Sequence, residues 1–365
     1  MGPGRKLVLA FASFASGALF CGVGAAQVTY SAIDKATVRV FAAHEVTTRD
    51  VTTKSGRSYR LAVPESVHGS GVRVAPDGLI LTAYHVVEHA SFVAVMGPAD
   101  AHARPASVVF ADQRHDYAFV YAGGPPSDAV SLPAVAPSVP VRSTVYAVGY
   151  PLDADRKQPQ SNRGIIAGAL RDGSLQLDIA VNPGNSGGPV TDEHEALLGI
   201  VVARGDPRKG VEGIGVAVPL DPILEGYRTL GAAGGPLERA RRRVARWGDA
   251  GWAKADLVAA ITSRESVLGM VREATARIAG GPGEDAPVIG PRLEDALART
   301  QRSDADVLVL AAAFAWNGAA VARDLGRDDY PKRLRLARTL CEAAVRLDTG
   351  VRARSPFVAT VLDAE

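Results

Sequence analysis

The sequence predicts an all-β N-terminal part followed by a separate, mainly α-helical C-terminal domain. Short runs rich in Val, Tyr and Phe, such as 92–96 and 144–148, are bounded by Gly, Pro and Asp, which is typical of β-strands and turns. After Gly231 the composition changes, and apolar residues recur at helical spacing. The expected helices span 236–247, 255–278, 292–302, 305–325 and 331–347.

The most informative block is 182–189, Asn-Pro-Gly-Asn-Ser-Gly-Gly-Pro. A serine between glycines in a tight turn presents its hydroxyl outward, and nearby backbone N–H groups can point to one spot beside it. Acyl transfer needs both a nucleophile and such an oxyanion hole. The same residue types also mark ordinary turns. The block alone therefore leaves a simple hairpin loop open.

Two other blocks supply the groups that a nucleophilic serine requires, a base and a residue that orients this base. Residues 69–87 read as a strand, a Pro-Asp-Gly turn, a second strand and then His85. Asp116 directly precedes the apolar strand 117–121. Along the chain the three residues follow in the order His85, Asp116, Ser186.

These blocks resemble those of HtrA/Deg-type serine proteases, in the chymotrypsin-like superfamily. The order His, Asp, Ser is that of chymotrypsin-like enzymes and differs from the subtilisin and α/β-hydrolase orders. The resemblance runs from about Ala36 to Leu230 and implies two six-stranded β-barrels and an ATP-independent endopeptidase of the bacterial envelope. The segments that carry it are 83–87, 116–120, 149–151, 164–168, 182–189, 198–201 and 213–219.

A mechanism follows for each residue. Ser186 is expected to attack the scissile carbonyl, His85 to take the serine proton and return it to the leaving amine, and Asp116 to hold the imidazole. Backbone N–H groups of Gly184 and Ser186, with Asn185 between them, are expected to form the oxyanion hole. The mechanism needs no cofactor.

The pocket for the residue before the cut bond is expected to be apolar. A pocket selective for Lys or Arg needs a carboxylate six residues before the serine, and Ala180 occupies that position. A buried cation would be unpaired there, so we expect cleavage after Val, Ala, Ile or similar residues, in extended segments that pair with 202–204 as an added strand. The expected substrate-binding residues are Ala180, Val181, Val202, Ala203, Arg204, Ile214 and Val216.

The sequence gives no sign of a metal site. His85 and His89 are four residues apart, but the order His-Val-Val-Glu-His differs from the zinc motif His-Glu-x-x-His, and no third ligand is evident. The net charge of +2 does not indicate nucleic-acid binding. The arginines within 239–246 fit either a solvated helix face or contacts with phosphates or anionic lipid. The expected partners are polypeptide substrates, and a homo-oligomer stays open.

The first 26 residues resemble a targeting segment. A positive Arg5-Lys6 pair is followed by an apolar stretch and a small-residue Gly-Ala-Ala site at 24–26. If it is not cleaved, the stretch 7–26 is long enough to anchor the chain in a membrane. Export to the periplasm or the medium is expected, whether the segment is cleaved or retained. Cleavage would leave Cys341 without a partner for an internal disulfide.

The expected domains are a signal peptide or anchor at 1–26, a protease domain at 36–230 and a helical domain at 236–365. Residues 47–66 read as a polar insertion, and 307–321 as a buried helix interrupted by Asn317. Many HtrA/Deg proteins carry a PDZ module after the protease, and this tail resembles none. The expected function is an exported serine endopeptidase acting on unfolded or extended polypeptides in protein quality control. A catalytically silent chaperone or scaffold, or an adaptor that binds a partner through its tail, stays open.

Overall fold

The computed structural model describes residues 29–364, except for 53–55, 57, 126, 153–155, 205–213, 232–233 and 263–288. The predicted targeting segment and part of the predicted helix 255–278 lie outside the described residues. Residues Ser31–Glu365 form one compact unit.

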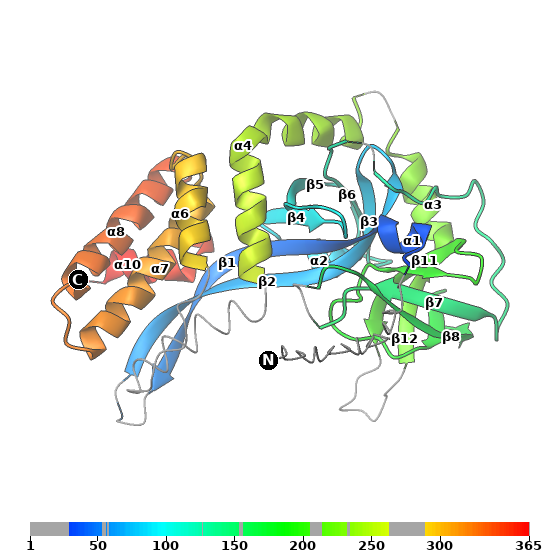
Figure 1. The fold of residues 1–365 in the computed structure, drawn as a ribbon, viewed down its shortest axis with the longest axis horizontal. Helices are drawn as coiled ribbons and strands as arrows, with labels where there is room; N and C mark the ends of the chain where they lie inside the picture. The colour runs from blue at the N-terminus through cyan, green and yellow to red at the C-terminus, as the bar shows by residue number, and fades with distance from the viewer. Residues whose placement is uncertain are drawn as a thin grey trace, which may run out of the picture. The chain divides into compact units, whose positions relative to one another are not determined.

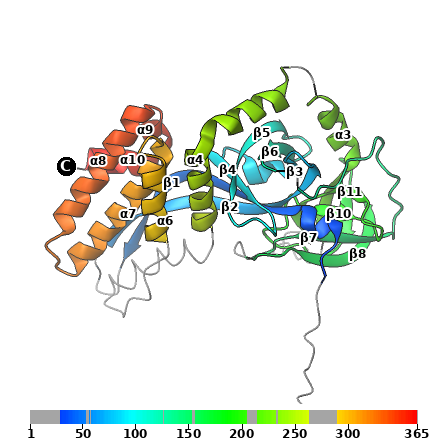
Figure 2. The ribbon, with the colours of Figure 1, turned by 45° about the horizontal axis from the view of Figure 1, so that its top comes forward.

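Two closed antiparallel β-barrels make up the β-rich part (Figure 1, Figure 2), which confirms the predicted double six-stranded barrel. The first, entered through α1 (Ala32–Ala36), has the strand order β1-β2-β3-β6-β5-β4, and the second has the order β10-β11-β12-β9-β8-β7. The strands of the first barrel are β1 (Thr37–Thr52), β2 (Ser58–Ala75), β3 (Leu79–Thr82), β4 (Phe92–Met96), β5 (Arg104–Asp112) and β6 (Tyr117–Tyr121). Those of the second are β7 (Thr144–Gly149), β8 (Gln160–Ala169), β9 (Leu175–Asp178), β10 (Pro189–Thr191), β11 (Leu197–Arg204) and β12 (Ile214–Pro219).

Each barrel is filled by the inward-facing residues of its strands, because successive side chains of a strand point to opposite faces. Val72, Leu81 and Phe119 pack in the first barrel, and this cluster continues to Ile200 and Val202 of the second barrel. Burying each such side chain stabilises the fold by about 1.5–3 kcal/mol. The continuous apolar cluster brings the two barrels together at the junction where the candidate site lies.

The two longest strands, β1 and β2, continue beyond the first barrel as a two-stranded ribbon, paired from Val46↔Pro64 to Thr52↔Ser58. The predicted polar insertion 47–66 is thus mostly strand. Leu61 and Ala62 are fully buried, because the C-terminal helices pack on the ribbon. An isolated ribbon would leave its strand edges unpaired and its stability marginal.

A helical C-terminal part is confirmed. α3 (Leu220–Arg228) follows the second barrel and packs on the first, where the Tyr117 hydroxyl donates to Pro222 O at 2.8 Å. The long α4 (Pro236–Thr262) turns sharply at Gly248, which has φ 49° and ψ −146°. Asp304 precedes α7 (Ala305–Asp324), and its side chain accepts two backbone N–H groups at the start of this helix. The remaining helices are α4 (Pro236–Thr262), α6 (Ile289–Arg299), α7 (Ala305–Asp324), α8 (Tyr330–Leu347), α9 (Val351–Arg354) and α10 (Pro356–Asp363).

Helix α7 covers the ribbon edge with side-chain hydrogen bonds. Asn317 accepts from Ala62 N at 2.8 Å and donates to Ala62 O at 3.0 Å, as a neighbouring strand would. The Trp316 indole donates to Arg60 O at 2.7 Å. Of the helices that the structure describes, α7 alone has the length and hydropathy of a membrane span, and it lies in the core of the helical part.

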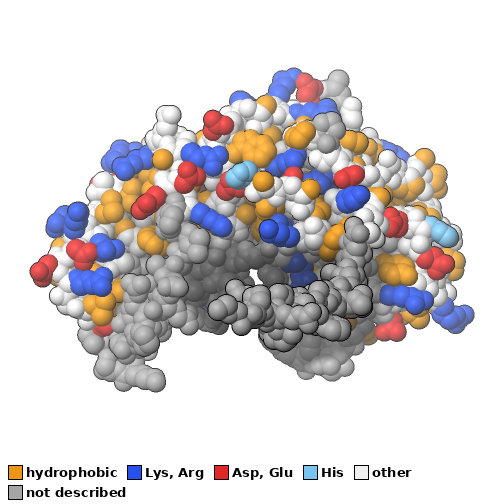
Figure 3. Space-filling model, viewed as in Figure 1, with side chains coloured by type: hydrophobic (Ala, Val, Ile, Leu, Met, Phe, Trp, Pro, Cys, Tyr) orange, Lys and Arg blue, Asp and Glu red, His pale blue; other side chains and the backbone are white. Residues whose placement is uncertain are grey.

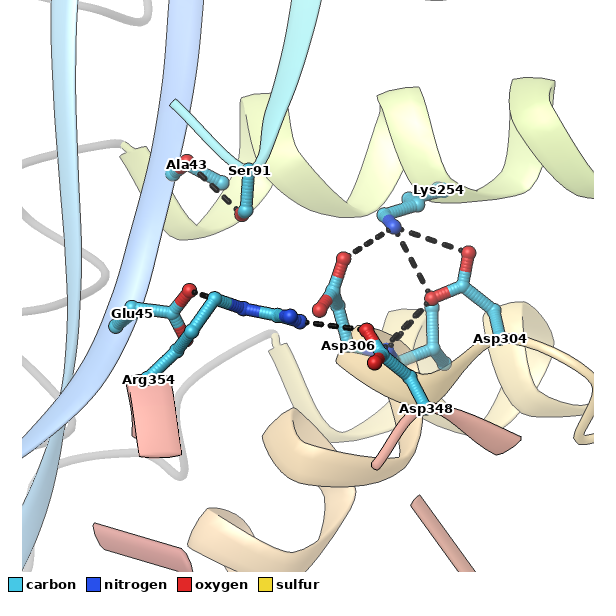
Figure 4. A network of polar contacts seen from close by, with 9 residues as sticks. Ala43, Glu45, Ser91, Lys254, Asp304, Asp306, Asp348 and Arg354 are labelled. Carbon is cyan, nitrogen blue, oxygen red and sulfur yellow. Dashed lines mark hydrogen bonds and ion pairs between the residues drawn. The ribbon is translucent and has the colours of Figure 1, made fainter. Parts of the chain in front are cut away.

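Ion pairs join the helical part to the first barrel (Figure 4). The nearly buried Lys254 of α4 binds Asp304 and Asp306, its Nζ 2.6 Å from the latter, and it lies 4.7 Å from the ring centre of Phe92. Burial lowers the pKa of Lys254, but the two carboxylates outweigh burial and raise the pKa overall. Close by, Arg354 pairs with Glu45 of β1 and with Asp348.

Candidate active site

His85 and Asp116 lie together at one end of the first barrel, where β3 ends and β6 begins. His85 sits on α2 (Tyr84–Val87), one turn that follows β3, and Asp116 precedes β6. The His85 ring nitrogen Nδ1 is 2.7 Å from Asp116 Oδ2, and the other carboxylate oxygen accepts the backbone N–H of His85 at 2.9 Å. One carboxylate therefore holds both the ring and the backbone of the histidine. The Nε2 nitrogen, on the opposite side of the ring, is left for proton transfer.

Asp116 adopts a left-handed backbone conformation, with φ 55°. Few residues other than glycine adopt it, although Asp is among those that do so more often. Its carbonyl oxygen accepts the backbone N–H of Tyr84 at 3.2 Å. Backbone and side chain of Asp116 thus both bind the α2 turn. Strained backbone of this kind is frequent at functional sites, where the surrounding contacts hold it.

The turn around Ser186 requires glycine at two positions. Gly184 has φ 99° and Gly187 has φ 85°. A Cβ at Gly184 would lie 2.2 Å from Tyr150 O, and one at Gly187 would lie 2.2 Å from Ser70 O. Any side chain would thus collide with backbone on either flank of the serine.

The hydrogen bonds of this turn leave two N–H groups for an anion. Pro183 O accepts Leu152 N at 2.7 Å, and Asn185 O accepts Gly188 N at 2.9 Å. In a trans peptide the N–H points opposite to the C=O, so the N–H groups of Gly184 and Ser186 point away from these partners. Neither N–H has an acceptor among the described residues.

The N–H of Asn185 is used inside the turn, where it donates to Asn182 O at 3.0 Å. Asn185 therefore shapes the predicted oxyanion hole through its backbone path, and its buried side chain lies against Gly149. Gly184 and Ser186 are the members that can donate.

Sequence reasoning missed Ser70, a fully buried residue of β2 that joins the two barrels at this point. Its hydroxyl donates to Gly184 O at 2.6 Å and accepts Tyr150 N at 2.9 Å. Its backbone N–H donates to Ser186 O at 2.7 Å. The only signal in the sequence was a small polar residue between two glycines, Gly69 and Gly71.

Tyr150, at the end of β7, fixes the other side of the same turn. It is fully buried, its hydroxyl donates to Thr37 O at 3.3 Å, and the Arg39 guanidinium lies 5.5 Å from its ring centre. Burial raises the pKa of Tyr150 well above its usual value, so the hydroxyl stays a donor.

The structure brings the three predicted residues to one junction between the barrels. Gly69 lies between the α2 turn and Ser186. A Cβ at this position would lie 2.6 Å from the side chain of Val86, the neighbour of His85, and 2.8 Å from Ser186 O. His85 is hydrogen-bonded to Asp116, and the Ser186 hydroxyl has no hydrogen-bond partner among the described residues.

The predicted pocket residues have different surroundings. Ala180 is exposed and its carbonyl accepts Asn162 Nδ2 at 3.0 Å. Val181 packs in the core of the second barrel. Val202 is buried at the barrel junction, where the half-buried Val216 packs against the same cluster, and Ile214 is half-buried. Ala203 and Arg204 belong to β11, and their side chains lie outside the described part of the structure.

The arginines of α4 and Cys341, which the sequence also singled out, are held by contacts within the fold. Basic side chains lie over the first half of α4, at the top of Figure 3. There Arg241 pairs with Asp77 and lies over Tyr121, and Arg243 donates to Ser107 at 3.1 Å. Burial raises the pKa of the Cys341 thiol to about 12, so this cysteine is unreactive at neutral pH. Within the described residues, no group of three His, Cys, Asp or Glu side chains could hold a metal.

Part of the chain is similar to known peptidases. Residues 69–200 match the trypsin-like peptidase domain. The chain is 33% identical over 204 residues to Protease Do-like 1, chloroplastic, of Arabidopsis thaliana, covering 52% of this chain and 46% of that protein. It is 30% identical over 173 residues to a probable periplasmic serine endoprotease DegP-like of Pseudomonas savastanoi, covering 46% and 35%. The chain thus spans less than half the length of these curated relatives.

Among solved structures, the serine endoprotease from Yersinia pestis is similar with a TM-score of 0.43 at 24% identity, over 57% of this chain and 70% of that one. A variant of the HtrA-type protease AlgW, solved with a tripeptide, is similar with a TM-score of 0.45 at 24% identity, over 56% and 62%.

Proposed function

We propose that the chain is an endopeptidase that cleaves polypeptides with His85, Asp116 and Ser186. The proposal is supported by the match of residues 69–200 to the trypsin-like peptidase domain and by the similarity of the chain to Protease Do-like and DegP-like proteins. The observation that carries the proposal is that the Asp116 carboxylate accepts two hydrogen bonds from His85, one from the ring at 2.7 Å and one from the backbone N–H at 2.9 Å. A carboxylate that only capped the α2 turn would not also need to hold the imidazole.

In the proposed reaction, Ser186 Oγ attacks the carbonyl carbon of the substrate while its proton passes to His85 Nε2. Asp116 stabilises the imidazolium, and the N–H groups of Gly184 and Ser186 bind the oxyanion. The C–N bond then breaks, and the amine leaves with the proton from His85. A water molecule hydrolyses the acyl-serine ester, with His85 again as the base.

We also propose that the residue before the cut bond is small or medium-sized and apolar. With Val181 in the barrel core, the pocket proposal rests on Ala180, Val202, Ile214 and Val216. The substrate would lie extended beside 202–204 of β11 and add a strand to the second barrel.

We propose that the protein is exported. The proposal rests on the targeting-like segment 1–26 and on the word periplasmic in the names of the DegP-like relatives. The boundaries 36–230 and 236–365 are proposed as protease and helical domains. These two parts share buried contacts, since Val46 and Ala62 of the ribbon pack in one cluster with α7, α8 and α10.

The decisive experiment replaces the triad residues one at a time and follows casein cleavage by the purified full-length protein. Ser186→Ala or His85→Ala is expected to lower kcat by about 10⁶, with little further loss when both are combined. Asp116→Asn is expected to lower it by about 10⁴ through the wrong histidine tautomer. Ser127→Ala is the matched control and is expected to leave turnover unchanged. The Ser127 hydroxyl donates to Pro125 O at 3.1 Å beside the turn that precedes β3, whereas His85 follows the other end of this strand. Casein cleavage retained by Ser186→Ala would contradict the assignment.

A further inference from the structure

The helical part contains a cavity that the proposed peptidase chemistry does not use. It has a volume of about 420 Å³ and lies between the ribbon end of β2 and helices α7, α8 and α10. This volume is within the range of small-molecule binding sites. We name it the α7–α8 pocket, and the residues that carry the argument are Trp316, Ala320, Arg323, Leu334, Arg335 and Arg338.

The walls of the α7–α8 pocket are apolar and held in place by the fold. Trp316, Ala320 and Arg323 follow one another at helical spacing on one face of α7. The indole of Trp316 is fixed at both ends, because Nε1 donates to Arg60 O at 2.7 Å and the ring meets Phe357 edge-on at 6.2 Å. Leu334 of α8 is half-buried in the lining. The apolar surface is thus formed before any ligand arrives.

The rim carries more positive than negative charge among the described residues. Arg323, Arg335 and Arg338 are exposed, and the described residues that line the pocket include no Asp or Glu. Arg338 lies 3.4 Å from Glu342 and donates to the backbone carbonyl of Ala364 at 3.3 Å. In the described part of the chain, Arg323 and Arg335 have no carboxylate within ion-pair distance. Two guanidinium groups are therefore available beside an aromatic wall.

We propose that the α7–α8 pocket binds a carboxylate that carries an apolar body. Guanidinium groups match the geometry of a carboxylate and bind it with paired hydrogen bonds. Arg323 and Arg335 would hold the carboxylate at the rim, while the apolar body lies against Trp316 and Leu334. The C-terminal end of a polypeptide and a fatty acid both present this chemistry. The proposal stands independently of the peptidase function, because no residue of the pocket belongs to the candidate active site.

Calorimetric titration of the full-length protein tests the proposal. The probes are decanoate, the acetylated tripeptide Ala-Leu-Val with a free carboxylate, the same tripeptide as its amide, and inorganic phosphate. At least one of the two apolar carboxylates is expected to bind, with the amide and phosphate about tenfold weaker or more. Tighter decanoate would indicate a lipid-derived ligand, and a tighter tripeptide acid would indicate a polypeptide end; either result supports the shared chemistry.

Variants locate the binding. Arg323→Glu and Arg335→Glu are each expected to weaken the affinity about tenfold or more, because each replaces an attraction by a repulsion. Arg327→Glu, an exposed position on the following loop outside the lining, is the matched control and is expected to leave the affinity unchanged. Ala320→Leu, which fills space next to Trp316, is expected to weaken the apolar acid without changing any charge.

Four results would overturn the proposal: no binding of either apolar acid at millimolar concentration, equal binding of acid and amide, equal binding of phosphate and apolar acid, or unchanged affinity in the folded Arg323→Glu/Arg335→Glu double variant. Circular dichroism of each variant confirms that it is folded before it is titrated.

Discussion

Replacing Ser70 by alanine tests how the turn around the nucleophile is held. The change removes one hydroxyl that donates to Gly184 O at 2.6 Å and accepts Tyr150 N at 2.9 Å. Two buried backbone groups then lose their partner, at about 1–3 kcal/mol each. We expect the free energy of unfolding to fall by about 2–6 kcal/mol, measured by urea denaturation.

The catalytic effect of Ser70→Ala is expected to exceed what the loss of stability explains. Loss of one oxyanion donor lowers kcat by about 10²–10³ in enzymes of this type. Here both proposed oxyanion donors stay, but the Gly184 carbonyl loses its hydrogen bond and the turn is held less firmly, so we expect kcat to fall by about 10–100-fold. KM is expected to stay within about threefold, because the proposed pocket residues are untouched.

The assay is steady-state hydrolysis of a short peptide ester, below the melting temperature of each variant. Ser91→Ala is the matched control, since the Ser91 hydroxyl also makes one hydrogen bond to a backbone carbonyl, Ala43 O at 3.1 Å, without contacting the turn. It is expected to lose about 1 kcal/mol of stability and no activity. If folded Ser70→Ala keeps kcat within about twofold of the wild type, Ser70 does not position the turn and the reasoning is wrong.

Three further predictions concern the helical part and the proposed substrate pocket. Asn317→Ala is expected to lower the free energy of unfolding by about 2–5 kcal/mol without changing kcat, because Ala62 N and O lose their partners. Urea denaturation measures this change. A loss below about 1 kcal/mol would show that water replaces the amide. Lys254→Met is expected to cost about 2–4 kcal/mol, because two carboxylates stay close together without their cation. The pKa of Lys254 is raised, so this contribution to stability is fully present below the usual lysine pKa. It disappears only as the pH rises through the raised pKa. A stability difference between Lys254→Met and wild type that shrinks between pH 6 and 9 would contradict the pairing. Ala180→Asp is expected to shift the cleavage sites of an unfolded protein from after Val, Ala and Ile toward after Arg and Lys, and an unchanged mass-spectrometric profile would remove Ala180 from the pocket.

The parts of the fold that could be predicted from the sequence are those that short segments specify. Strand runs between turn residues identify the barrels, and the glycines around Ser186 reflect a turn in which any Cβ would collide with backbone. The order of His85, Asp116 and Ser186 is also readable, because each residue lies beside a strand that gives it a recognisable context.

The missed features depend on partners that are distant in the sequence. Ser70 binds Gly184 and Tyr150, which are 114 and 80 residues away. Asn317 interrupts an apolar helix in the sequence, yet it completes the edge of β2 by binding Ala62, 255 residues away. The 47–66 segment reads as polar because many of its residues stay exposed, and the helices that bury Leu61 and Ala62 follow much later in the chain. No local pattern contains these contacts.

The most direct test of the central claim is labelling with an alkyl fluorophosphonate, followed by peptide mass spectrometry. In this reaction Ser186 Oγ forms a bond to phosphorus, fluoride leaves, and His85 takes the serine proton. We predict one adduct per chain on Ser186, none in folded Ser186→Ala, and labelling slowed by several orders of magnitude in His85→Ala. A folded wild-type protein that takes no label, or a Ser186→Ala variant that is labelled as fast as wild type, would contradict the proposed nucleophile and favour a catalytically silent scaffold.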